Sequence, residues 1–131
     1  MLALFARSRL PAADIIRRSG QLDALALAPS CAQSMEELEL AHHLAQGCSE
    51  RKACIANKFK YEFLLWLTGK TDIKSAIAQS APKDGNLLIV SFGEGKQKIL
   101  EALDAEEDSR PLPRRGDPLR LEAISLSRIR N

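Results

Sequence analysis

Residues 69–92 read GKTDIKSAIAQSAPKDGNLLIVSF, and this stretch decides the fold class. Its first part predicts a short helix that is capped by Thr71 or Asp72 and ends before Pro82. The Asp-Gly pair in PKDGN then predicts a turn. The run NLLIVSF at 86–92 is almost continuously apolar, which is typical of a buried central strand. A helix and a buried strand this close together in the sequence favour a mixed fold.

The segments before this stretch continue the mixture of strands and helices. DALALAP at 23–29 predicts a short strand that a proline ends. Ser34 and Glu37 form a capping box, which predicts a helix from there to about Gln46, just before a glycine. NKFKYEFLLWL at 57–67 repeats its large apolar residues at helical spacing. It therefore predicts a second helix, with its first residue, an asparagine, as the N-cap.

The segments after the central strand add two helices and a connection. GEGKQKILEAL at 93–103 predicts a short helix, and Asp117 followed by Pro118 predicts the start of a last one. Between them, residues 104–118 hold three prolines and a block of acids followed by arginines, so we expect a flexible connection. We therefore expect a single α+β domain over residues 1–131, with a small central sheet packed against several helices.

The first 20 residues carry four arginines against one acid and open with an apolar run of about five residues. That run is too short for a signal peptide. It predicts an N-terminal strand followed by a basic loop, and a transit peptide is the alternative.

The tripeptide Gly69-Lys70-Thr71 is the end of a Walker A phosphate loop, but the rest of that motif is missing. Leu64 occupies the position of its first glycine, and the residues before Gly69 predict a helix instead of a strand. We expect Gly69 to end this helix in the left-handed conformation. The next helix then starts beside Lys70 and Lys74, which suits an anion such as a phosphate. The alternative is a simple corner with both lysines in solvent.

Charge is unevenly distributed although the net charge is only +2. Residues 24–50 contain four acids and no Lys or Arg, whereas residues 51–74 contain six bases against two acids. On composition alone, this asymmetry favours a solvated surface that happens to be basic. An anionic partner for the basic segment is the alternative.

The residue types needed for catalysis do not occur in a recognisable arrangement. His42 and His43 are adjacent, so on a helix they point in different directions and do not share a metal. Three cysteines without a C-x-x-C motif suit a reducing cytoplasm. No apolar run has the length of a membrane helix. We therefore expect a cytoplasmic protein that is not an enzyme and has no catalytic residue, metal or cofactor. A small enzyme stays an alternative for which no residue is a candidate.

Residues 54–92, CIANKFKYEFLLWLTGKTDIKSAIAQSAPKDGNLLIVSF, contain an ordered set of motifs. The first motifs are Ile-Ala-Asn, then an apolar helix centred on Glu62, and then Gly69. An isoleucine, an Ala-Ile pair and the turn Lys-Asp-Gly-Asn follow before an apolar strand. In this order the chain resembles archaeal members of the family of the smallest regulatory subunit of the KEOPS (EKC) complex, which includes the eukaryotic kinase-binding protein TPRKB. The resemblance covers about residues 23–103. Residues 108–118, which we call the Pro/Arg-rich segment, and the loop at 70–72 depart from the family pattern.

This resemblance implies a non-catalytic accessory subunit. KEOPS makes threonylcarbamoyladenosine in tRNA, and in this family the subunit binds the small atypical kinase/ATPase of the complex. Archaeal members also bind tRNA through its single-stranded CCA 3′ end. By this resemblance we expect the nucleic-acid site at six residues: Asn57, Lys58, Gly69, Lys70, Ile73 and Lys74.

The last helix is the expected docking site for the kinase. Its apolar residues span more than one face, so one side can pack on the chain and another on a partner. Packing within the chain alone is the alternative. The residues concerned are Leu121, Ile124, Leu126 and Ile129. If RNA does not bind, the alternative function is a protein-interaction module that regulates a kinase.

Overall fold

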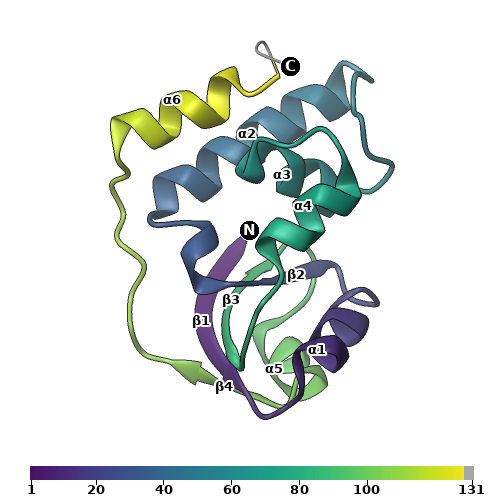
Figure 1. The fold of residues 1–131 in the computed structure, drawn as a ribbon, viewed down its shortest axis with the longest axis vertical. Coiled ribbons are helices and arrows are strands. Elements are labelled where there is room, and N and C mark those ends of the chain that lie inside the picture. The colour runs from purple at the N-terminus through teal and green to yellow at the C-terminus, as the bar shows by residue number, and fades with distance from the viewer. Residues whose placement is uncertain (129–131) are drawn as a thin grey trace. The chain divides into compact units, whose positions relative to one another are not determined.

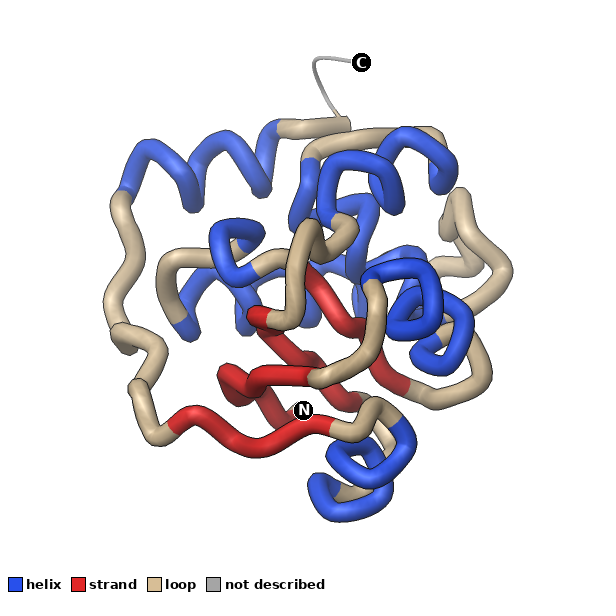
Figure 2. Tube along the Cα trace, turned by 60° about the horizontal axis from the view of Figure 1, so that its bottom comes forward, coloured by secondary structure: helices blue, strands red, loops and turns tan. Residues whose placement is uncertain are grey.

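The fold is built on a four-stranded antiparallel sheet in the order β2-β3-β1-β4. The computed structural model describes residues 1–128, and Figure 1 shows their course. The four strands lie side by side (Figure 2). They are β1 (Leu2–Ser8), β2 (Ala24–Leu27), β3 (Asn86–Ser91) and β4 (Ala105–Asp108).

Along the described chain, at least one helix separates each strand from the next, which confirms the predicted α+β class. A 3-10 helix, η1 (Pro29–Cys31), follows β2. Within residues 1–128, no helix combines the length and apolar character that crossing a membrane requires. The α-helices are α1 (Ala12–Ser19), α2 (Met35–Glu50), α3 (Phe59–Thr68), α4 (Ile73–Ser80), α5 (Lys96–Ala102) and α6 (Pro118–Leu126).

The chain divides into two compact units, each with its own internal contacts. Residues 1–31 and 80–112 form the sheet unit, which holds the sheet with α1 and α5. Among the described residues, 32–79 and 113–128 form the helical unit, which holds α2, α3, α6 and all of α4 except its last residue. Whether residues 1–131 make a single domain stays a prediction.

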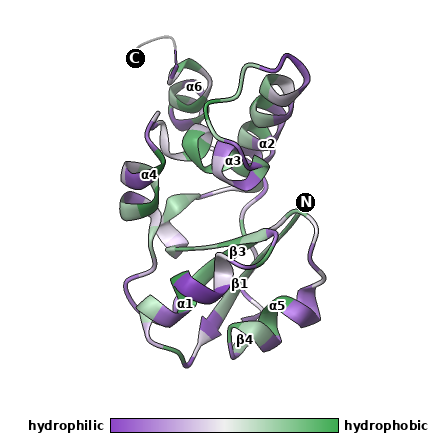
Figure 3. Ribbon diagram, turned by 90° about the vertical axis from the view of Figure 1, so that its right-hand side faces the viewer, coloured by the Kyte–Doolittle hydropathy of each residue, from purple (hydrophilic) through white to green (hydrophobic). Residues whose placement is uncertain are grey.

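β3 is an inner strand of the sheet unit, as its apolar run predicted. It pairs with β1 on one side and with β2 on the other, and its residues 87–91 are buried. The inner strands are mostly hydrophobic in Figure 3. Ile15 of α1 and Ile99 of α5 belong to one apolar cluster with residues of β1, β2 and β3, so both helices cover the same face of the sheet.

The turn before β3 needs a glycine because the chain passes close to β1. The N–H of Ser8 donates to the carbonyl of Gly85 over 2.8 Å. A Cβ atom on Gly85 would collide with the carbonyl oxygen of Ser8. The predicted Asp-Gly turn is therefore confirmed, and its glycine is required because the backbone of β1 approaches it closely.

Two elements of the sheet unit differ from the sequence prediction or were absent from it. The basic segment after β1 is helix α1 and not a loop, because Ile15 falls on the side that packs into the apolar cluster. Strand β4 lies inside the segment predicted as a flexible connection. Its sequence, AEED, has little strand propensity, and pairing with β1 over four residues holds it in place.

The helical unit packs α6 against α2 and α3. At the start of α2, Ser34 accepts a hydrogen bond from the N–H of Glu37, which confirms the capping box. α2 continues through Gly47 to Glu50, four residues past the predicted end at Gln46, because one glycine in a helix interior is tolerated. The N-cap of α3 is Lys58 and not Asn57, so that prediction was one residue early.

The chain before α6 also caps α2. The carbonyls of Pro113 and Arg114 accept hydrogen bonds from the N–H groups of Met35 and Glu36 over 2.7 and 3.0 Å. The Glu36 carboxylate accepts in return from the N–H of Gly116 over 2.8 Å. The Pro/Arg-rich segment thus supplies two of the acceptors that the first turn of a helix needs.

Candidate functional site

The corner between α3 and α4 holds four of the six predicted nucleic-acid-binding residues. Gly69 has φ 73°, which confirms the left-handed helix end. The N–H groups of Gly69 and Lys70 donate to the carbonyls of Trp66 and Leu65 over 3.3 and 3.2 Å, the pattern of a Schellman motif. This tight ending brings the half-buried Ile73 and the exposed Lys70 and Lys74 onto one corner.

The start of α4 already carries an anion of its own. Asp72 Oδ2 accepts from the N–H of Ser75 over 2.9 Å and from its hydroxyl over 2.7 Å. The hydrogen bonds from Ser75 hold the pKa of Asp72 below its ordinary value, with a smaller contribution from the positive charge of Lys74. A phosphate at this corner would therefore rely on Lys70 and Lys74 more than on the helix N-terminus.

Asn57 and Lys58 lie at the opposite end of α3 from this corner. Both side chains are exposed, and Lys58 is the residue before the first turn. A helix of ten residues separates the two groups, which corresponds to about 15 Å along its axis. The six predicted residues therefore form two basic groups on one unit and do not converge on one pocket.

The lysines of these groups form none of the ion pairs found among the residues that the structure describes. This holds for Lys58, Lys70 and Lys74, and also for Lys52 in the segment before α3. Lys60 was counted with them in the sequence, but it is only 4% exposed and lies over the ring of Tyr61. Lys60 is therefore not available to a ligand.

The small residue of α4 beside this corner is not accessible. Ala76 is fully buried in the helical unit, so its surface cannot face a ligand. Tyr61, an aromatic residue of α3, is half-buried.

The predicted partner-binding residues of α6 do not form one exposed face. Ile124 is 6% exposed, and Leu121 and Leu126 are half-buried. Ile129 lies outside the described residues. Helical spacing places Leu126 on the same side as Leu119, two turns earlier, and opposite Ile124.

Leu119 is the exposed apolar residue of α6 that the sequence prediction missed. Its side chain is 75% exposed, the highest value among the large exposed hydrophobic residues of the described chain. Ala123, one turn later, is exposed too. Together with Leu126 these residues make a narrow apolar stripe on the outer side of α6. The spacing of apolar residues in the sequence indicates this outer stripe only weakly, because the inner side of the helix is apolar as well.

Two buried carboxylates connect α6 with the rest of the helical unit. Glu37 Oε1 accepts from Arg120 Nε over 2.8 Å, and Glu62 Oε2 is paired with the guanidinium of Arg128. That guanidinium also lies 4.1 Å from the centre of the Trp66 ring. Arg120 in the first turn of α6 and Arg128, two residues after its end, are therefore held by charge as well as by packing.

One titratable side chain of α2 packs against an aromatic ring of α3. Burial lowers the pKa of His42, whose ring meets that of Phe59 edge to face at 5.3 Å. No group of three or more His, Cys, Asp or Glu side chains within residues 1–128 could hold a metal ion.

Comparisons with known proteins do not assign the chain to a family. Its sequence matches no protein-family model and no curated protein. The resemblance to the KEOPS subunit therefore rests on the motifs of residues 54–92.

Proposed function

We propose that this chain is a cytoplasmic, non-catalytic accessory subunit of a KEOPS-type complex that binds tRNA and the small atypical kinase/ATPase. The observation that carries the RNA-binding part is the unpaired lysines at both ends of α3. Each lysine that neutralises a phosphate releases a counterion, and this release is a major source of affinity for nucleic acid. The motif order of residues 54–92 supports the choice of tRNA and of this complex.

The spacing of the two basic groups favours a stretch of strand over a single nucleotide. About 15 Å separates Lys58 from the corner at Gly69. Single-stranded RNA is held by charges that follow its backbone, together with contacts to its bases. The single-stranded CCA end of tRNA, which the resemblance indicates, has this form.

The test is a binding titration with two tRNA transcripts, one intact and one lacking its CCA end, each at two salt concentrations. We expect the intact tRNA to bind more tightly, and its affinity to fall as salt rises. Equal affinity for both transcripts would remove the CCA end from the proposal. If neither binds at low salt, RNA binding is wrong.

Substitutions at the corner locate the site. Lys70→Glu combined with Lys74→Glu should lower tRNA affinity by at least about tenfold, because two phosphate contacts are lost and two repulsions are added. Lys83→Glu is the control, because Lys83 is exposed, forms none of the ion pairs described for the chain and belongs to the sheet unit. An equal loss in the control would mean generic attraction by charge.

The outer stripe of α6 favours a second candidate function, that of a kinase-binding module without RNA affinity. Leu119 presents an apolar side chain to solvent, and an apolar helix face commonly lies in a groove of a partner. Leu119→Glu should weaken binding to the kinase while leaving tRNA affinity unchanged. If both functions are present, the two sets of substitutions separate them.

A further inference from the structure

We propose that the loop of residues 51–58 contacts single-stranded RNA beyond its two expected residues Asn57 and Lys58, with Arg51 and Lys52 on phosphates and Ile55 against a base. This inference deepens the RNA-binding function proposed above and rests on it. Arg51, Lys52 and Ile55 were not among the residues expected from the resemblance. The loop, RKACIANK, joins α2 to α3 (Figure 1).

The loop is strongly basic, and its charges are not used inside the protein. It contains three bases and no acid. Arg51, Lys52 and Lys58 are exposed, and none of them is in an ion pair within the described chain. The guanidinium of Arg51 donates to Cys48 Sγ over 3.9 Å, which is a long contact. This surface therefore suits an anionic partner.

Lys52 has an unfavourable backbone conformation that a glycine would adopt more easily. The N–H groups of Lys52 and Ala53 donate to the carbonyls of Ser49 and Cys48 over 3.2 and 2.9 Å. This is the same Schellman ending that Gly69 gives to α3, but here the left-handed residue is a lysine with φ 55°. A lysine at a position where glycine is favoured supports a functional role for the lysine side chain.

Glu62 holds the second half of the loop in one conformation. Its Oε1 atom accepts the N–H groups of Ile55 and Ala56 over 2.8 and 2.9 Å, and its Oε2 atom is paired with Arg128. With these N–H groups satisfied, the Ile55 side chain is nevertheless 48% exposed. The loop therefore presents an apolar side chain from a fixed backbone.

An apolar side chain between bases suits single-stranded RNA better than a duplex. In a duplex the faces of the bases are stacked on one another, whereas a single strand exposes them. Ile55 can pack on such a face while Arg51 and Lys52 on one side, and Lys58 on the other, contact the backbone. A partner that binds through charge alone would not require a contact with Ile55.

The test uses the full chain, a fluorescein-labelled RNA twelve-mer of mixed sequence and the intact tRNA transcript. Lys52→Gly should raise the urea midpoint, because the strain is removed, and should lower RNA affinity about fivefold at 0.1 M salt. Lys52→Arg keeps the charge and should keep the affinity. Lys83→Gln removes an unpaired charge from the sheet unit and is the control for generic attraction.

Ile55→Ser tests the contact with a base. We expect about fivefold weaker binding with an unchanged salt dependence, because no charge is lost. Leu119→Ser removes another exposed apolar side chain and should not change RNA affinity.

Three outcomes are distinguishable. A more stable Lys52→Gly variant with weaker RNA binding supports the loop as a contact. Unchanged affinity in both loop variants, with a loss in the Lys70→Glu and Lys74→Glu variant, overturns the loop contact and leaves the proposed function standing. If the unaltered chain binds neither RNA at low salt, both proposals fail.

Discussion

Charged side chains are arranged differently in the two units. The described part of the sheet unit pairs most of its basic side chains with acids, in five ion pairs: Arg9–Glu106, Arg17–Asp14, Lys96–Glu107, Lys98–Glu94 and Arg110–Asp108. The described part of the helical unit has two pairs, and each contains a buried carboxylate. Its surface lysines are left unpaired. The difference indicates which unit can bind an anion, although both are rich in bases.

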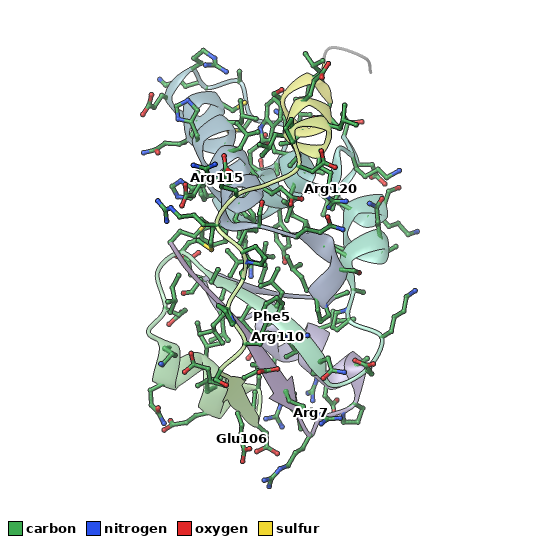
Figure 4. The ribbon with its side chains drawn as sticks, turned by 90° about the vertical axis from the view of Figure 1, so that its left-hand side faces the viewer. Phe5, Arg7, Glu106, Arg110, Arg115 and Arg120 are labelled. Atoms are coloured by element: carbon green, nitrogen blue, oxygen red, sulfur yellow. The ribbon has the colours of Figure 1, made fainter. Side chains whose placement is uncertain are left out.

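Arg110 illustrates how the sheet unit uses its bases internally. Its guanidinium lies 4.4 Å from the centre of the Phe5 ring and 3.7 Å from Asp108 Oδ2, and Figure 4 shows it beside Phe5. The same residue lines a shallow hollow of about 180 Å³ beside β1 and β4. An arginine that already contacts an aromatic ring and a carboxylate interacts less favourably with an anionic ligand than a lysine in solvent does.

The largest expected effect comes from breaking a buried ion pair. Glu62→Ala should lower the free energy of unfolding by about 3–5 kcal/mol, because it leaves the largely buried charge of Arg128 uncompensated and removes the acceptor for two N–H groups. Urea unfolding followed by circular dichroism measures this loss. Glu106→Ala, which breaks an exposed pair of the sheet unit, should lower it by less than about 1 kcal/mol. Similar losses in both variants would contradict the distinction between the units.

The next largest effect distinguishes the two sides of α6. Ile124→Ala should lower the free energy of unfolding by about 2–4 kcal/mol, because it opens a cavity in the helical unit. Leu119→Ala should change it by less than about 0.5 kcal/mol. Thermal and urea unfolding give both values. Any weakening of the kinase complex in Ile124→Ala has to be corrected for this loss of stability. Equal stability of the two variants would mean that Ile124 contributes no more to the core of the helical unit than the exposed Leu119 does.

A smaller effect is expected at the end of α3. Gly69→Ala should lower the free energy of unfolding by about 1 kcal/mol, because alanine is strained at φ 73°. No atom obstructs the added methyl group closely, so the backbone conformation sets the effect. Gly95→Ala is the matched control, with φ −71° and open space around it, and should be close to neutral. A neutral Gly69→Ala would argue against the left-handed ending.

The smallest effect is a pH dependence at the start of α4. Because Asp72 has a lowered pKa in the folded chain, its contribution to stability is present above its ordinary pKa, near 3.8. It is lost as the pH falls through the folded value. Asp72→Asn still caps the helix but does not ionise near this pH. The difference in urea midpoint between the two proteins should therefore shrink between pH 6 and pH 3, and a constant difference would exclude this role.

The sequence predicts those parts of the fold whose signals are local. The apolar run of β3, the capping box at Ser34, the left-handed Gly69 and the start of α6 at Asp117 each depend on residues a few positions apart, and the structure confirms them. Because neighbouring residues determine these elements, short stretches of the sequence are sufficient to predict them.

The sequence does not predict features that depend on distant partners. β4 is a strand because β1 pairs with it, about a hundred residues earlier in the chain. Glu62 looks like a surface acid until Arg128, 66 residues later, is seen to pair with it. The exposed corner lysines followed from local helix ends, whereas the burial of Lys60 did not. The pairing and burial of such residues depend on segments that are distant in the sequence.

The two arginines that compensate the buried carboxylates also set an order of events during synthesis. Arg120 and Arg128 lie 83 and 66 residues after Glu37 and Glu62, so they leave the ribosome after every other element of the helical unit. Since domains generally form as the chain emerges, we expect α2 and α3 to stay loosely associated until residue 128 is outside the exit tunnel. Limited proteolysis of nascent chains stalled with residue 112 and then residue 128 exposed should show protection of α3 only in the longer one. Equal protection in both would mean that the carboxylates do not wait for their arginines.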